Sequence, residues 1–177
     1  MSFSHISPYE LTRNPFDLIY NDWMLVSAAN ESGEQCGRDY NMMTANWGGV
    51  GVLWRKPVAF VFIRPQRHTF LFAENNDRMT LSFFDEKHHK ALEFCGKYSG
   101  RDYDKAKECS LNPVFDENSG RAVYFEEAKL VLVTRKLYVQ PLDEQFALSD
   151  TVTSHYPGKD YHKMFICEIE DVLISGK

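Results

Sequence analysis

Two arginines and a threonine follow the most apolar stretch of this chain. Residues 57–63 read Pro-Val-Ala-Phe-Val-Phe-Ile, a composition typical of a buried strand. Arg64, Arg67 and Thr69 come directly after it. Guanidinium groups and a hydroxyl at the end of a strand can hold a phosphate by charge-assisted hydrogen bonds. The pattern therefore predicts a phosphate-binding corner.

A small, polar, glycine-bearing segment precedes this strand. Where side chains are small, backbone amides and carbonyls can approach a flat ring closely. A lone Trp is more often a core residue, but the position of Trp47 between Asn46 and Gly48 favours a place beside such a ring. The segment thus suits a heterocycle, as the arginines suit its phosphate. Its candidate contacts are Asn41, Met43, Thr44, Ala45, Asn46 and Trp47.

A third segment, Ser99-Gly100-Arg101, leads into the start of an expected helix, where free N–H groups can bind an anion. Asp102 and Asp104 would repel a phosphate placed directly at that helix end. We therefore expect Arg101 and Lys105, one helical turn apart on the same face, to supply the attraction. A capped surface helix with an internal ion pair is the alternative.

These segments, in this order, resemble the flavin reductase-like family of FMN-binding split-barrel proteins. Tyr98–Lys105 is similar to the family's Ser-Gly-Arg-Asp-x-Asp-Lys segment, and Asp160–Ile169 to its closing Asp-x-His-x-x-x-x-Gly-Glu-Val strand. The matches run from about Asp39 to the C-terminus. Cys167 stands where the family usually has Gly, which bears on how closely this strand approaches its neighbour or the cofactor.

The resemblance implies FMN as the cofactor and assigns roles to individual residues. Arg67 and Thr69 would hold the phosphate and ribityl chain, whereas Arg64 is equally compatible with a solvated charge. His162, which by itself reads as an ordinary polar residue before a strand, would orient the hydride donor. The implied cofactor contacts are Asn41, Met43, Thr44, Ala45, Asn46, Trp47, Arg64, Arg67, Thr69, Ser99, Gly100, Arg101 and Lys105.

The function implied is an FMN-dependent NAD(P)H:flavin oxidoreductase, a homodimer that takes a hydride from NADH or NADPH and passes electrons to an unidentified acceptor. The sequence has no hydrolytic triad or carboxylate pair, but in flavin enzymes the redox chemistry resides in the cofactor. Three alternatives stay open: a noncatalytic FMN-binding electron-transfer or storage module, a small-substrate oxidase like pyridoxamine phosphate oxidase, and, more weakly, a haem-binding split barrel.

Composition narrows the classes of partner. The net charge of −5, without a Lys/Arg-rich block, argues against nucleic-acid binding. Neither a signal peptide nor a membrane span is indicated, so we expect a cytoplasmic protein. The four cysteines are widely spaced, and the adjacent His88 and His89 would diverge by about 100° on a helix. No metal site is predicted.

The elements that would position these residues are mostly strands. The 177 residues suit a single domain, with residues 1–20 as an N-terminal arm that includes a helical turn near 16–20. Strand-like segments recur at short spacing and two short helices interrupt them, which favours a mainly β, closed architecture. The resemblance specifies a split β-barrel of Greek-key type. The expected strands are 24–29, 57–63, 79–83, two within 122–141 with a bulge at Glu126–Glu127 between them, and 164–174. Residues 40–47 and 49–54 are expected to form either two strands or one long strand bent at its glycines. The expected helices are 85–96 and one from Asp102 or Asp104 to before Pro113, and 69–74 is either a helical turn or extended.

Overall fold

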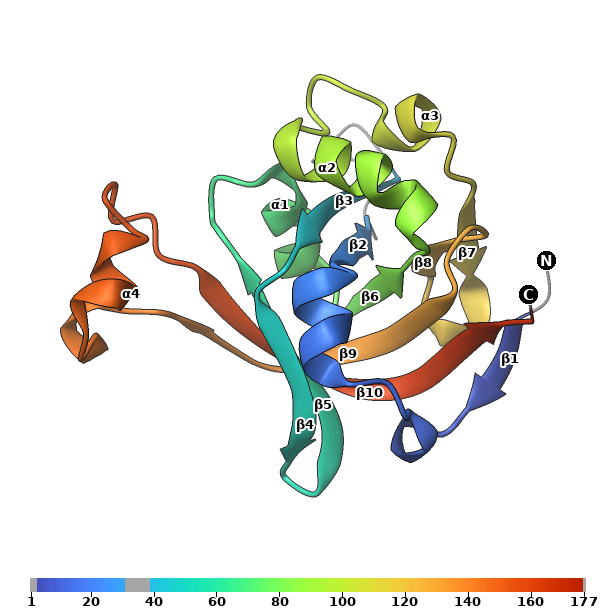
Figure 1. Ribbon diagram of the computed structural model, residues 1–177, viewed down its shortest axis with the longest axis horizontal. Helices are drawn as coiled ribbons and strands as arrows, with labels where there is room; N and C mark the ends of the chain where they lie inside the picture. The colour runs from blue at the N-terminus through green and yellow to red at the C-terminus, as the bar shows by residue number, and fades with distance from the viewer. Residues whose placement is uncertain (1–2, 31–38, 177) are drawn as a thin grey trace.

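The computed structural model describes residues 3–30 and 39–176, and Figure 1 shows their arrangement. The strands are β1 (Phe3–Ile6), β2 (Met24–Ala29), β3 (Tyr40–Ala45), β4 (Gly48–Leu53), β5 (Lys56–Ile63), β6 (Arg78–Phe83), β7 (Pro113–Asp116), β8 (Ala122–Phe125), β9 (Leu130–Pro141) and β10 (Lys163–Ser175). The helices are α1 (His68–Asn75), α2 (His89–Lys97), α3 (Lys105–Cys109) and α4 (Asp150–Ser154). Shorter helical turns cover Pro8–Glu10, Asp17–Asn21, Glu86–His88, Glu117–Ser119 and Glu144–Phe146.

One antiparallel sheet forms a split β-barrel. Its strands follow the order β3-β2-β6-β9-β10-β5-β4, with β1 paired to β10. The two ends of this path, β3 and β4, are consecutive in the chain and only Asn46 and Trp47 separate them. A bend in the chain therefore joins the two ends of the sheet, and this bend carries part of the predicted site.

The barrel interior is filled from alternating positions of its strands. On β5 the inward side chains are Ala59, Val61 and Ile63, which confirms the predicted buried strand. On β10, Cys167 is fully buried in the same core, opposite Ala59. Burial raises the pKa of this thiol to about 12. Cys167 thus acts as a core side chain beside a small neighbour, and the barrel accommodates it where the family usually has Gly.

A second apolar layer covers the outer face of β2, β6 and β9. Helix α2 and the β7–β8 hairpin supply Leu92 and Phe125 to this layer, which pack with Leu25 and Val131 of the sheet. The layer holds α2 beside β3, and α3 lies at the same end of the molecule in Figure 1. The short helices are therefore held against the site rather than on an independent domain.

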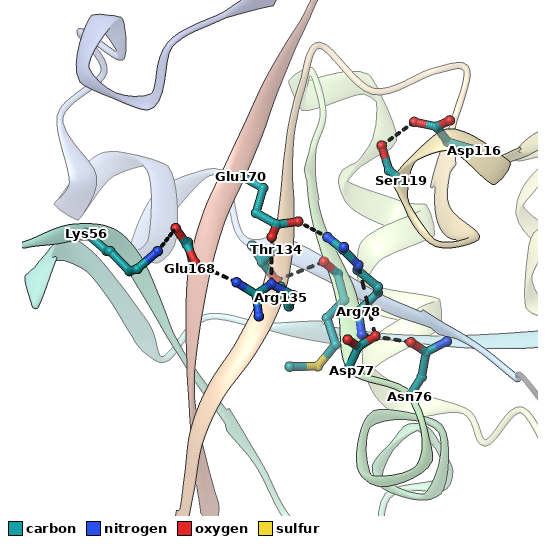
Figure 2. A network of polar contacts seen from close by, with 11 residues as sticks. Lys56, Asn76, Asp77, Arg78, Asp116, Ser119, Thr134, Arg135, Glu168 and Glu170 are labelled. Carbon is teal, nitrogen blue, oxygen red and sulfur yellow. Dashed lines mark hydrogen bonds and ion pairs between the residues drawn. The ribbon is translucent and has the colours of Figure 1, made fainter. Parts of the chain in front are cut away.

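Ion pairs on the outside of the barrel join four adjacent strands (Figure 2). Glu168 on β10 contacts Lys56 on β5 at 2.5 Å and Arg135 on β9 at 3.0 Å. Arg135 also contacts Glu170 at 2.7 Å, and Glu170 pairs with Arg78 on β6. Because each carboxylate sits between two cations, the network stabilises the strand order that shapes the barrel.

Several local elements differ from those predicted, because the sequence does not reveal which strands pair with each other. Residues 122–141 do contain two strands, but β8 pairs with β7 and not with β9. Glu126–Glu127 is a turn between two sheets, so the predicted bulge there is wrong. Residues 69–74 lie in helix α1. The N-terminal arm does have a helical turn at Asp17–Asn21. It also contributes β1, which pairs with an edge of β10.

Two searches over the described residues were negative. No helix among them has the length and apolarity needed to cross a membrane. Within the same ranges, no three side chains of the metal-binding types lie close enough to share an ion.

Candidate active site

Two adjoining cavities lie where the β3–β4 bend, the end of β5 and the start of α1 meet. The first, which we call the Trp47 cavity, has a volume of about 230 Å³. The second, which we call the cationic cavity, has a volume of about 150 Å³. The Trp47 cavity is lined by Met43, Thr44, Ala45, Asn46, Trp47, Phe62, Arg64, Arg67 and His162. The cationic cavity is lined by Asn41, Gln66, Arg67, His68, Thr69, Lys97, Tyr98, Ser99, Gly100, Arg101 and Lys105.

All fourteen residues that the sequence singled out line one of these two cavities. They come from four separate stretches of the chain, so the fold brings them together. Phe62, Gln66, Lys97 and Tyr98 also contribute, and the sequence reasoning missed them. For Phe62 a signal existed, because it lies two residues before Arg64 and strand side chains two apart share a face.

The charge of the cationic cavity is strongly one-sided. Among the described residues, its lining contains four cations, Arg67, Lys97, Arg101 and Lys105, and no carboxylate. The whole chain, by contrast, has a net charge of −5. Cations without acidic partners raise the local potential and favour an anionic ligand. The lining therefore suits a phosphate group.

Arg67 is the one residue shared by both cavities. Its backbone N–H donates to the carbonyl of Arg64 at 3.0 Å across the turn that contains Pro65, and it is the N-cap residue of α1. Burial and the nearby Arg64 lower the pKa of its guanidinium. Within the described ranges, no carboxylate pairs with this group. Its donors are therefore available to a ligand at the junction of the two cavities.

The start of α1 adds neutral donors to the cationic cavity. The first N–H groups of a helix lack intrahelical partners and attract anions. Thr69, in the first turn, is 1% exposed, and its hydroxyl accepts a hydrogen bond from Asn41 Nδ2 at 3.0 Å. A hydroxyl that accepts this bond keeps its own proton for another acceptor.

Gly100 forms a close backbone wall of the same cavity. A Cβ placed there would lie 2.1 Å from Asn41 Oδ1 and 2.8 Å from Asn41 Cγ. Asn41 is 4% exposed and held by Thr69, so it has little freedom to move away. Only glycine lets the loop 98–101 approach β3 this closely.

Lys105 is more deeply held than the sequence suggests. It is 4% exposed, and its ammonium donates to the carbonyls of Met42 and, at 3.1 Å, Cys95. Burial lowers its pKa to about 8, an effect that the neighbouring Cys95 opposes. Lys105 therefore ties α3 to β3 and α2 while it adds positive charge to the cavity wall.

The expected helical pairing of Arg101 with Lys105 is wrong. Helix α3 begins at Lys105, and Arg101 lies in the turn before it. Asp104 is the N-cap of this helix, and its carboxylate accepts the N–H of Lys107. Because capping consumes this carboxylate and Asp102 is exposed, neither acid lines the cationic cavity.

Arg64 lines the Trp47 cavity, but its donors are used within the protein. Its guanidinium donates to Asp160, and to the carbonyl of His155 at 2.9 Å. It also lies 5.1 Å from the ring centroid of Tyr156. Arg64 thus joins the end of β5 to the connection between β9 and β10. The structure does not place it in the cationic cavity.

The β3 segment presents its backbone to the Trp47 cavity. Thr44 Oγ1 donates to the carbonyl of Leu92 on α2 at 2.6 Å, so this side chain is used to fix the helix. Trp47 is 39% exposed, and its ring centroid lies 5.1 Å from that of His162. The cavity therefore has an aromatic edge and a polar backbone wall, which suit a flat heterocycle.

His162, 9% exposed, is neutral near pH 7. Burial first, and then the cations Arg64 and Arg67, lower its pKa to about 4, whereas Asp160 acts in the opposite direction. Its Nδ1 lies 2.9 Å from the hydroxyl of Tyr156, a residue that the sequence did not indicate. An uncharged imidazole therefore faces the cavity.

This neutral histidine predicts a loss of stability in acid. Between about pH 6.5 and pH 4 the unfolded chain binds a proton that folded His162 does not, so stability is complete above pH 6.5 and falls below it. We expect a loss on the order of 2 kcal/mol by pH 4.5. Urea unfolding of the wild type and of His162→Asn at pH 7 and pH 4.5 measures it. An identical pH dependence in both proteins would contradict the prediction.

A larger cavity, about 410 Å³, lies beside the N-terminal arm and contains none of the predicted residues. Its charged side chains are mixed in sign and several are already paired, such as Arg13 with Asp22 and Lys129 with Asp22 and Asp85. Size alone therefore does not identify the site, and the one-sided charge of the smaller cationic cavity does.

Comparison with known proteins agrees with this geometry. The sequence profile of the Flavin reductase like domain matches residues 19–177. A search of curated protein sequences finds no match. Flavoredoxin of Desulfovibrio vulgaris (Miyazaki F) superposes with a TM-score of 0.66 at 21% identity, over 87% of this chain and 69% of that one.

Two further solved structures share the fold. The FMN-binding protein of Thermus thermophilus, with bound 1-cyclohex-2-enone, has a TM-score of 0.64 at 19% identity over 92% of this chain and 77% of that one. The NADH:FAD oxidoreductase SgcE6 of Streptomyces globisporus C-1027, in complex with NAD and FAD fragments, has a TM-score of 0.60 at 15% identity over 88% and 81%. From the profile match over most of its length, the chain belongs to the flavin reductase-like domain family.

Proposed function

We propose that this protein is an FMN-dependent NAD(P)H:flavin oxidoreductase. The observation that carries the proposal is the pair of cavities joined at Arg67. One has an aromatic edge and a backbone wall, and the other, in the part of the chain that the structure describes, has four cations and no carboxylate. A ring joined by a short chain to a phosphate has this same division of chemistry.

The residues present fit FMN. The guanidinium of Arg67, which pairs with no carboxylate of the described residues, would bind the phosphate together with the hydroxyl of Thr69 and the start of α1, and Arg101 and Lys105 would add charge. Gly100 lets its loop lie directly against Asn41, where a Cβ would collide. The bend from Met43 to Trp47 would contact the ring. Bound there, the flavin supplies the redox chemistry, and the protein supplies binding and orientation.

The hydride donor is proposed to be a reduced nicotinamide. His162 and Trp47 line the Trp47 cavity, and Trp47 is 39% exposed, so a flat nicotinamide would reach the ring from this side. One structural relative is an NADH:FAD oxidoreductase solved with NAD and FAD fragments, which supports this choice of donor. His162 would contact the reacting partners as a neutral hydrogen-bonding group.

Anaerobic spectroscopy tests the proposal. Purified protein incubated with FMN and freed of excess ligand should show a flavin band near the visible absorption of FMN, and NADH or NADPH should bleach it. A colourless protein that stays free of flavin after this treatment would refute both binding and activity. A retained band that neither nucleotide bleaches would support instead a noncatalytic electron-transfer or storage module, the function that the name of the flavoredoxin relative suggests.

The partner that we propose is a second copy of this chain. Two elements project from the barrel in Figure 1, the β4–β5 hairpin and the connection that carries α4. Both expose large apolar side chains: Val52 and Trp54 on the hairpin, and Phe146 and Leu148, 69% and 98% exposed, on the connection. Apolar groups gathered on projections are typical of protein interfaces. Sedimentation equilibrium should give twice the monomer mass of 20.6 kDa, and a monomer would refute the homodimer.

A further inference from the structure

Tyr156 is a buried tyrosine at the end of the β9–β10 connection, beside the Trp47 cavity. It is 6% exposed, although the connection around it is largely exposed. Its ring stacks on that of Tyr161 with centroids 4.2 Å apart and planes at 22°. The guanidinium of Arg64 lies 5.1 Å from its centroid. The phenol ring is therefore contacted both by Arg64, at the end of a barrel strand, and by Tyr161, in its own segment.

The barrel also holds the backbone on both sides of Tyr156. Arg64 donates to the carbonyl of His155 at 2.9 Å, and both Arg64 and Gln66 donate to the carboxylate of Asp160. At the far end, the carbonyl of His162 accepts the N–H of Leu142 at 2.8 Å. Residues 155–162 are thus fixed to the end of β5, although they belong to a long projecting connection.

The hydroxyl of Tyr156 lies 2.9 Å from Nδ1 of His162. A buried phenol O–H needs an acceptor, and in the described part of the chain this nitrogen is the side-chain acceptor within reach. Burial raises the pKa of Tyr156, so the phenol keeps its proton.

If Nδ1 accepts, a neutral imidazole must have its proton on Nε2. The groups around His162 keep it neutral: Arg64 and Arg67 oppose a further positive charge, and Asp160, the acid nearby, is occupied by Arg64 and Gln66. A neutral ring with this tautomer can only donate from Nε2. The Nε2–H group would then donate a hydrogen bond to an acceptor atom in the cavity, such as a carbonyl oxygen or an unprotonated ring nitrogen.

We propose that Tyr156 is a positioning residue that holds His162 as the Nε2–H tautomer and so presents a neutral hydrogen-bond donor to the aromatic ligand of the Trp47 cavity. The proposal rests on the proposed flavin reductase function for its consequence, because the carbonyl groups of flavin and of the nicotinamide carboxamide are acceptors of the required kind. A donor without charge fits a site that already contains two guanidinium groups.

The tautomer can be measured without any ligand. In protein labelled with ¹⁵N-histidine, long-range ¹H–¹⁵N correlation spectra at pH 7 distinguish the two neutral forms, and His162→Asn assigns the signals among the six histidines. We expect the Nε2–H form in the wild type and a mixture of both forms in Tyr156→Phe. The matched control is Tyr161→Phe, which changes the stacked neighbour and should leave the spectrum unchanged.

Kinetics then test the consequence. With FMN bound, Tyr156→Phe should lower kcat for NADH oxidation by about 10-fold, the effect of one lost hydrogen bond, with little change in KM for NADH. Tyr161→Phe should retain the wild-type kcat. An Nδ1–H signal in the wild type, or a wild-type spectrum in Tyr156→Phe, would overturn the proposal. The two spectroscopic outcomes do not depend on flavin binding. Failure of the proposed function would therefore be seen separately, as a protein that has the expected tautomer but binds no flavin.

Discussion

Replacing Arg67 with alanine is expected to raise the dissociation constant for FMN by about 100-fold, the largest effect of any substitution in the site. Arg67 is the residue shared by both cavities, and among the described residues it has no carboxylate partner. A charge-assisted, two-pronged contact with phosphate contributes more than a neutral hydrogen bond. Fluorescence titration of FMN into wild type and Arg67→Ala measures the change.

The control for Arg67→Ala should remove the same charge elsewhere. Arg55 lies at the tip of the β4–β5 hairpin and lines neither cavity. Arg55→Ala should bind FMN like the wild type, which would exclude a general effect of net charge. Riboflavin, which lacks the phosphate, gives a second control, because its affinity should change little in Arg67→Ala. Equal losses for FMN and riboflavin would place the phosphate somewhere else.

The second large effect is expected from Gly100→Ala. The new methyl group would lie 2.1 Å from Asn41 Oδ1, so either Asn41 or the loop 98–101 must move. Asn41 donates to the hydroxyl of Thr69, and a shift of either group disturbs the cationic cavity. We expect a loss of about 1–3 kcal/mol in stability and at least about 10-fold weaker FMN binding.

Two further variants make the Gly100 prediction specific. Gly51 lies on β4, and a Cβ there meets nothing within 4 Å, so Gly51→Ala should change neither property. Asn41→Ala removes the atoms with which the new methyl group would collide. The double variant Gly100→Ala/Asn41→Ala should therefore recover part of the stability lost in Gly100→Ala. Additive losses would show that the methyl group acts on some other contact.

The sequence was sufficient for features that depend on local chemistry. The apolar run 57–63 predicted β5 because a β-branched and aromatic segment of this length is suited to a buried strand. A second short helix was expected to begin near Asp102 or Asp104, and α3 begins at Lys105 with Asp104 as its N-cap. Gly100 was named through the family resemblance, and the structure shows that a Cβ at this position would collide with Asn41.

The role of each site residue depended on partners remote in the chain. Arg64 and Arg67 occupy similar positions in the sequence, three residues apart after the end of the same strand. Arg64 is drawn to Asp160, 96 residues later, whereas Arg67 faces the junction of the two cavities. Lys105 likewise donates to the carbonyl of Met42, 63 residues earlier. No local pattern distinguishes a cation that binds a ligand from one that binds the protein.

By itself, then, the amino-acid sequence determined most of the strands, where the cations and glycines of the site lie in the chain, and that these segments belong to one family. Only the tertiary structure decided that β3 and β4 end the sheet on either side of the bend at Trp47, and that Tyr156 reaches His162. The physical reason is the separation along the chain over which each kind of interaction acts. Propensity and capping act within a few residues, whereas hydrogen bonds and ion pairs are chosen among groups that meet only after the barrel has formed.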